Sequence, residues 1–217
     1  NITDDEVNSQ ANDDNVTTPT SARLSDEEKR NNVTNMVVKK LRGVSGMPMT
    51  SEAVKAFFKV VNIPTVNHFD GVAFDMFDSF DELFARSEVT FVKKHVCSGN
   101  LIVKFEVFLK KMYYLLNGRE AEPTGEEYEV TLVPIIRRFD CLKQLRTSAK
   151  EKERKLYEML ENVKSWRSTA SGNGAHFAMF LPDEALDKAI ESIVTLYIYV
   201  TGMCLKQLKE RYPNELN

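Results

Sequence analysis

Glycine and proline are scarce in this sequence, and strand-like patterns are missing. Seven prolines and nine glycines stand among 217 residues, and most of them fall between apolar segments rather than inside them. Apolar and polar residues alternate for only a few positions at a time, and no turn dipeptide is flanked by strand-like segments. These absences argue against a sheet built from hairpins. Apolar residues recur at helical spacing instead, which predicts an all-α fold of about seven helices.

Long apolar runs are also missing. A membrane-spanning helix needs roughly 18 or more consecutive apolar residues, and no such run occurs. The longest apolar segment, residues 193–205, is shorter and includes Thr195, Thr201 and Gly202. It predicts a deeply buried helix of the core.

Signatures of catalysis and of cofactor binding are not found either. The sequence has no glycine-rich phosphate loop, no nucleophile elbow and no HExxH motif. Only His95 has a cysteine close by, Cys97, whereas a structural zinc site needs four ligands. We therefore expect no enzymatic activity, no metal site and no cofactor.

Charge divides the chain into two parts. Residues 1–22 hold five acids and no Lys or Arg, so the remainder has 27 of the 32 acids and all 29 bases. A body this close to neutral gives no electrostatic footprint for nucleic acid. Because residues 1–22 also lack aromatics and periodicity, they predict a disordered acidic tail. We expect a helical domain at residues 23–211 to follow, and then a flexible end at 212–217.

Capping residues mark the predicted helix starts. Ser25 and Glu28 form a capping box that begins a helix running to about Leu41. Thr50 or Ser51 should begin the next helix, and Pro64 should end it. Further capping signals predict a helix start at Ser79 with Glu82 and a last helix from Pro182 to about Arg211.

Glycines and a proline mark the predicted breaks. Gly99 and Gly118 each follow an apolar-periodic run, so each should end a helix. A long helical stretch should run from about residue 126 to residue 167, with a kink or a fresh start at Pro134. Residues 146–155 within it are nearly all polar and should project into solvent.

The segment FDMFDSFDE, residues 74–82, repeats a Phe-Asp unit every three residues. Its acids do not have the spacing of an EF-hand calcium loop. We interpret it as core packing with a solvated acidic edge. The alternative is a docking edge for a protein partner, formed by Phe74, Asp75, Phe77 and Asp78.

Basic residues occur in four clusters, at Lys93-Lys94, Lys110-Lys111, Arg137-Arg138 and residues 150–155. The interspersed acids favour a mixed, solvated surface. If some clusters converge on one face, that face could instead bind an acidic surface such as a glycan or a lipid headgroup.

Cysteines and glycosylation sequons leave the compartment open. Cys97, Cys141 and Cys204 are an odd number, so in a reducing compartment they would be small buried hydrophobes, and in a secreted chain two of them could pair. Sequons at Asn1, Asn15 and Asn32 are compatible with a secretory route.

Residues 80–118, FDELFARSEVTFVKKHVCSGNLIVKFEVFLKKMYYLLNG, resemble the variable merozoite surface antigens of Babesia. In that family an S-G-N turn is paired with a K-F-E-x-F-L-K-K-M-Y helix, and the matching residues here are Ser98, Gly99, Asn100 and 104–113. The rest of the chain is similar in general style, with a polar tail followed by helices.

This resemblance implies a non-enzymatic parasite surface antigen. Such proteins follow the secretory route and are held on the outer face of the parasite plasma membrane by a C-terminal glycolipid (GPI) anchor, which we expect to be missing after NELN. The family takes part in first attachment to erythrocytes and is a target of antibodies.

Together, the resemblance and the basic clusters suggest contact with a host-surface protein or acidic glycan through Lys93, Lys94, Lys110 and Lys111. An intracellular helical adaptor that docks partners through residues 74–84 is the alternative.

Overall fold

The fold is all-α, as the helical spacing predicted. The computed structural model describes residues 24–42, 49–65, 67–86, 88–117, 130–169 and 181–217, and no strand occurs in these ranges. The predicted disordered tail at residues 1–22 lies outside the described residues, as do Gly43 and Gly118.

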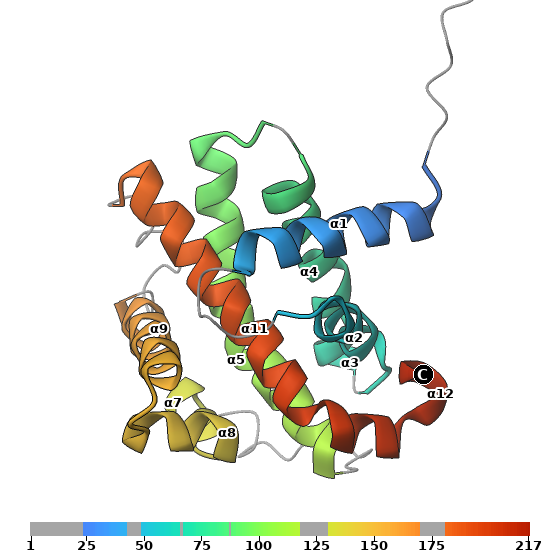
Figure 1. Ribbon diagram of the computed structural model, residues 1–217, viewed down its shortest axis with the longest axis vertical. Helices are drawn as coiled ribbons and strands as arrows, with labels where there is room; N and C mark the ends of the chain where they lie inside the picture. The colour runs from blue at the N-terminus through green and yellow to red at the C-terminus, as the bar shows by residue number, and fades with distance from the viewer. Residues whose placement is uncertain (1–23, 43–48, 66, 87, 118–129, 170–180) are drawn as a thin grey trace, which may run out of the picture.

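Two long helices, α5 (Phe91–Asn117) and α11 (Asp183–Arg211), lie side by side through the middle of the molecule (Figure 1). One side of this pair is covered by α1 (Asp26–Leu41), α2 (Ser51–Asn62), α3 (Asn67–Asp70) and α4 (Val72–Phe80), which continues as the π-helical segment η1 (Asp81–Ala85). The other side carries α7 (Leu132–Ile136), α8 (Asp140–Lys143), the 3₁₀ helix η2 (Gln144–Thr147) and α9 (Glu151–Thr169). The chain ends in α12 (Pro213–Leu216), which packs against α2 and α11.

Three predicted helix starts are confirmed. Ser25 and Glu28 form the capping box of α1: Ser25 Oγ accepts from the Glu28 N–H at 3.2 Å, and the Ser25 N–H donates to Glu28 Oε2 at 2.7 Å. Thr50 caps α2, because its Oγ1 accepts from the Ala53 N–H at 3.2 Å. Pro182 directly precedes α11, which ends at Arg211 as expected.

The apolar segment at residues 193–205 lies in α11 and is largely buried, as predicted. Among the described helices, α11 is the one that is long and apolar enough to cross a membrane, and 61% of its most apolar window is buried inside the structure. Its side chains pack on α5 and α2, so in this fold it serves as a core helix.

Aromatic rings gather where α2, α4, α5 and α11 meet. Tyr197 of α11 is fully buried, and its ring lies 4.9–5.6 Å from the rings of Phe57, Phe105 and Phe108. Phe80 stacks on Phe57 at 5.2 Å from the other side. These contacts join four helices into one core.

Two predicted helix boundaries are wrong. Ser79 is buried inside α4 and caps nothing, because the helical face that carries Met76, Phe80 and Phe84 runs through it into η1. Gly99 lies inside α5, which is continuous from Phe91 to Asn117. Glycine costs a helix interior about 1 kcal/mol, and the burial of the residues that follow outweighs that cost.

The helical stretch expected at 126–167 is divided in its described part, and the end of the chain contains a short helix. From residue 130 onward this stretch forms the separate elements α7, α8, η2 and α9, with turns between them. Residues 146–155 are mostly exposed, as predicted. The expected flexible end at 212–217 instead forms α12, because Leu216 is buried against the core.

The substitution Phe105→Ala should lower the free energy of unfolding by about 3–5 kcal/mol, because Phe105 is fully buried against Tyr197 and the cavity cannot close. Urea titration would measure this. Val103→Ala on the same helix is the control, since Val103 is 40% exposed and should change stability by less than about 0.5 kcal/mol. Equal effects of the two substitutions would show that the packed face of α5 is assigned wrongly.

Candidate functional site

Two of the four lysines predicted to contact the host surface are buried. Lys110 is 8% exposed and Lys111 is 1% exposed, so neither can present its charge to a partner. Lys110 pairs with Glu106 one turn earlier on α5, at 2.9 Å. The predicted contact through Lys110 and Lys111 is therefore wrong.

Lys111 is a structural cation. Its Nζ donates to the Val61 carbonyl at 2.8 Å and lies 3.5 Å from Asp70 Oδ1. Val61 is in the last turn of α2, where carbonyls lack helical partners, so Lys111 satisfies one of these groups. Burial lowers the pKa of Lys111 despite the attraction of Asp70.

Asp70 completes this arrangement on the other side of Lys111. Its Oδ1 accepts from the N–H and the hydroxyl of Thr65, both at 3.0 Å. Burial opposes the ionised form of Asp70, but the hydrogen bonds from Thr65 and the charge of Lys111 outweigh it and lower the pKa of Asp70. The group therefore ties α5 to the end of α2 and to the segment before α4.

Lys93 and Lys94 lie near the surface, but both are paired. Lys93 Nζ is 2.8 Å from Glu82 Oε1, and Lys94 Nζ is 3.0 Å from Asp183 and from Asp187. The two carboxylates on α11 therefore carry more negative charge than the single positive charge of Lys94. The structure does not bring Lys93, Lys94, Lys110 and Lys111 together into one positive surface.

The predicted docking edge at 74–78 is partly occupied by contacts within the chain. Asp75 pairs with Lys104, and the Arg30 guanidinium lies 5.4 Å from the centre of the half-buried Phe77 ring. Asp78 is exposed beside a cavity of about 210 Å³ between α1 and α4. The side chain of Phe74 lies outside the described residues.

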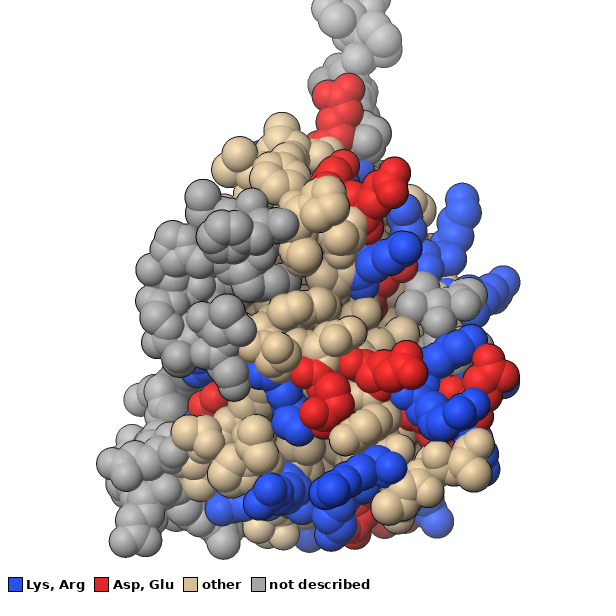
Figure 2. Space-filling view, turned by 90° about the vertical axis from the view of Figure 1, so that its left-hand side faces the viewer, with Lys and Arg blue, Asp and Glu red and all other residues tan. Residues whose placement is uncertain are grey.

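A different cluster of cations does converge. The segment from α7 through α8 and η2 to α9 borders an open cavity of about 280 Å³. Its lining residues are Val133, Ile136, Arg137, Leu142, Lys143, Arg146, Tyr157, Leu160, Glu161 and Lys164. We call it the basic pocket. The helices α7, α8 and α9 that carry it lie on the left-hand side of the molecule in Figure 1, and on that face Lys and Arg side chains form a band along the lower edge (Figure 2).

Helical spacing builds one wall of the basic pocket. Along α9, Leu160 and Glu161 lie one turn after Tyr157, and Lys164 lies one turn after them. The facing wall is α7 with Arg137 just after its last residue, and η2 supplies Arg146. Buried Ile136, Leu142 and Leu160 form the apolar floor.

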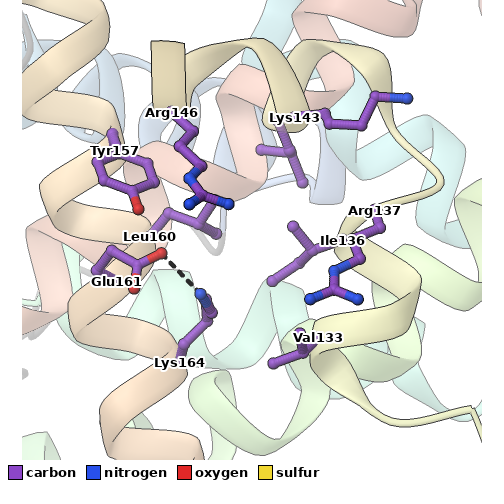
Figure 3. A pocket seen from close by; sticks show the side chains of 10 residues that line it. Val133, Ile136, Arg137, Lys143, Arg146, Tyr157, Leu160, Glu161 and Lys164 are labelled. Carbon is purple, nitrogen blue, oxygen red and sulfur yellow. Dashed lines mark hydrogen bonds and ion pairs between the residues drawn. The ribbon is translucent and has the colours of Figure 1, made fainter.

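Three of the four cationic groups of the basic pocket point toward its centre. Figure 3 shows Arg137 reaching in from one side and Arg146 and Lys164 from the other, while the ammonium group of Lys143 points away. Glu161 pairs with Lys164 at 2.7 Å, and Lys143 pairs with Asp140 at 3.0 Å. Within the described ranges, Arg137 and Arg146 pair with no acid.

This arrangement suits an acidic group attached to a partly apolar body. Two planar guanidinium groups can each donate two parallel hydrogen bonds to a carboxylate, sulfate or phosphate. The Tyr157 hydroxyl and the Glu161 carboxylate lie on the same wall and can bond to hydroxyl groups of a ligand. A sugar acid combines all of these features.

Arg137 was visible in the sequence as part of a basic cluster, and Arg146 begins the polar segment at residues 146–155. No sequence pattern indicated that the chain turns back at η2 and brings them together.

No metal centre is found in the described part of the chain. His95 and Cys97 lie on α5 without a third potential ligand, and no group of three His, Cys, Asp or Glu side chains occurs among the described residues. Comparison of this chain with protein-family models, with curated proteins and with solved structures gives no match.

Replacing Lys111 by Glu should lower the free energy of unfolding by about 3–5 kcal/mol, because a buried carboxylate would face the Val61 carbonyl and Asp70 without a cation. Urea titration is the measurement. Lys152→Glu on the exposed surface of α9 is the charge-matched control and should have little effect. If the two variants unfold at the same urea concentration, Lys111 is not buried as described.

The lowered pKa of Asp70 makes the free energy of unfolding depend on pH in the acidic range. Its carboxylate stabilises the fold fully above the pKa of an unfolded Asp, about 3.9, and this contribution is lost as pH falls from there through the lower pKa of the folded state. Asp70→Asn should be less stable than the unchanged protein at pH 7, and the difference should shrink toward pH 2 in thermal unfolding. A difference that stays constant with pH would contradict this assignment.

Proposed function

We propose that this chain is the helical ectodomain of a parasite surface antigen, similar to the variable merozoite surface antigens of Babesia, and that it contributes to attachment to host erythrocytes. The basic pocket is proposed to hold an acidic group of a host-surface glycan. Antibodies of the host would be further partners of the exposed helices.

The observation that carries this proposal is the convergence of Arg137, Arg146 and Lys164 on one cavity. Guanidinium groups that pair with no acid among the described residues are available to one on a partner. Erythrocyte surfaces are rich in acidic glycans, so this chemistry matches the proposed partner. Asn32 of the third sequon is exposed on α1, which is compatible with the secretory route, whereas Val33 and Thr34 of the same sequon are buried.

Binding at such a site should be weak for one molecule. Arg137 and Arg146 are exposed, and charges in contact with water are screened beyond about 8 Å at physiological salt. Many copies on one membrane would turn weak single contacts into firm attachment, because each later contact forms at a high effective concentration.

The proposal predicts that the double substitution Arg137→Glu with Arg146→Glu lowers binding to erythrocytes by at least about tenfold, since two favourable charge contacts become repulsive. Beads that carry many copies of the protein would be counted on erythrocytes by flow cytometry. Binding of the unchanged protein should fall as salt rises, and dextran sulfate should compete where neutral dextran does not.

Lys55→Glu with Lys59→Glu is the matched control. Both lysines are exposed on α2, on the other side of the central helix pair, and the net charge changes by the same amount. This variant should bind nearly as well as the unchanged protein. If both variants lose binding equally, overall charge and not the pocket explains the effect. If the pocket substitutions leave binding undiminished, the pocket is not the attachment site.

A further inference from the structure

Two of the three cysteines meet at the contact between α8 and α11. Cys141 is in the first turn of α8 and Cys204 is in the last third of α11, and both half-buried side chains pack against the core. The helices α8 and α11 are in contact, and each of the two thiols shifts the pKa of the other. The backbone is held at the same place, because the Tyr199 hydroxyl of α11 donates to the Cys141 carbonyl at 3.1 Å.

From this geometry we propose that Cys141 and Cys204 form an intramolecular disulfide that ties α8 to α11, with Cys97 left as a free thiol. A disulfide needs two side chains that already face each other, since the Cβ atoms must lie about 4 Å apart. The contact between α8 and α11 and the Tyr199–Cys141 hydrogen bond hold the two helices next to each other at this place. Cys97 is on α5, and no other thiol is near it in the described structure.

The two thiols have different parts in the reaction. The interaction between the two thiols lowers the pKa of Cys141 and raises the pKa of Cys204, so Cys141 is the first to become a thiolate. The thiolate attacks one sulfur of a disulfide oxidant such as oxidised glutathione, and one glutathione leaves. Cys204 then attacks the mixed disulfide, and the second glutathione leaves. The two cysteines lose two electrons and two protons, and oxidised glutathione becomes two molecules of glutathione.

The expected consequence is that the layer of α7, α8, η2 and α9, which carries the basic pocket, is held more firmly to α11. A bond between residues 141 and 204 closes a loop of 63 residues and restricts the unfolded chain. Cys141 directly precedes Leu142 and Lys143 of the basic pocket, so the bond would hold one wall of that pocket to α11. The proposal does not depend on what the pocket binds.

The test uses the purified chain incubated with oxidised glutathione and then analysed by intact-mass and peptide mass spectrometry. The expected product has lost the mass of two hydrogen atoms, contains a Cys141–Cys204 cross-linked peptide and has no internal bond at Cys97. The melting temperature should be roughly 4–16 °C higher than that of the reduced protein.

Three single variants complete the experiment. Cys97→Ser should still form the bond and show the full shift in melting temperature, whereas Cys141→Ser and Cys204→Ser should show neither. A product that carries glutathione on Cys141 or Cys204 without closing the internal bond would overturn the proposal, and so would a bond that includes Cys97.

Discussion

The buried contact between Tyr197 and Leu101 fixes how the two central helices lie, and the other layers depend on it. The Tyr197 hydroxyl is fully buried and donates to the Leu101 carbonyl at 2.6 Å. This bond forms in only one axial register of α11 against α5. A shift along either helix would leave a buried hydroxyl without a partner, at a cost of about 1–3 kcal/mol. The same ring packs on Phe57, Phe105 and Phe108, so the polar contact also sets where α2 joins the core.

Local signals predicted the class of fold and those helix ends where no competing burial acts. Ser25, Thr50 and Pro182 are themselves exposed and stand directly before helices, and each marks a true start. Ser79 and Gly99 carry similar signals but are buried, and there the continuous apolar faces of α4 and α5 decide the structure. A capping residue is worth about 1 kcal/mol, whereas burying one large apolar side chain is worth about 1.5–3 kcal/mol. Tertiary packing therefore overrides the local signal at both positions.

The candidate site could not be predicted because charge in a sequence does not show which charges remain free. Lys110 and Lys111 look like a surface cluster, yet Glu106, Asp70 and the Val61 carbonyl hold both of them within the core. These partners lie up to 50 residues away along the chain. Arg137 and Arg146 are less conspicuous in the sequence, and their importance depends on the chain reversal between α7 and α9. What distinguishes the two groups is the position of acids in space, which only the fold determines.

The basic pocket lies in a layer that is joined to the rest of the molecule by few polar contacts. Glu106 of α5 connects Lys110 on its own helix to Arg167 of α9, whose guanidinium lies 3.4 Å away. Tyr199 holds the backbone of α8 from the other side. Lys110 thus orients the carboxylate that anchors α9, the helix that bears one wall of the pocket, although it contacts no ligand itself. All walls of the basic pocket come from the layer of α7, α8, η2 and α9, so the pocket keeps its shape only if that layer is held at both ends. Glu106 holds the layer at α9, and Cys141 with Cys204 lies where α8 meets α11.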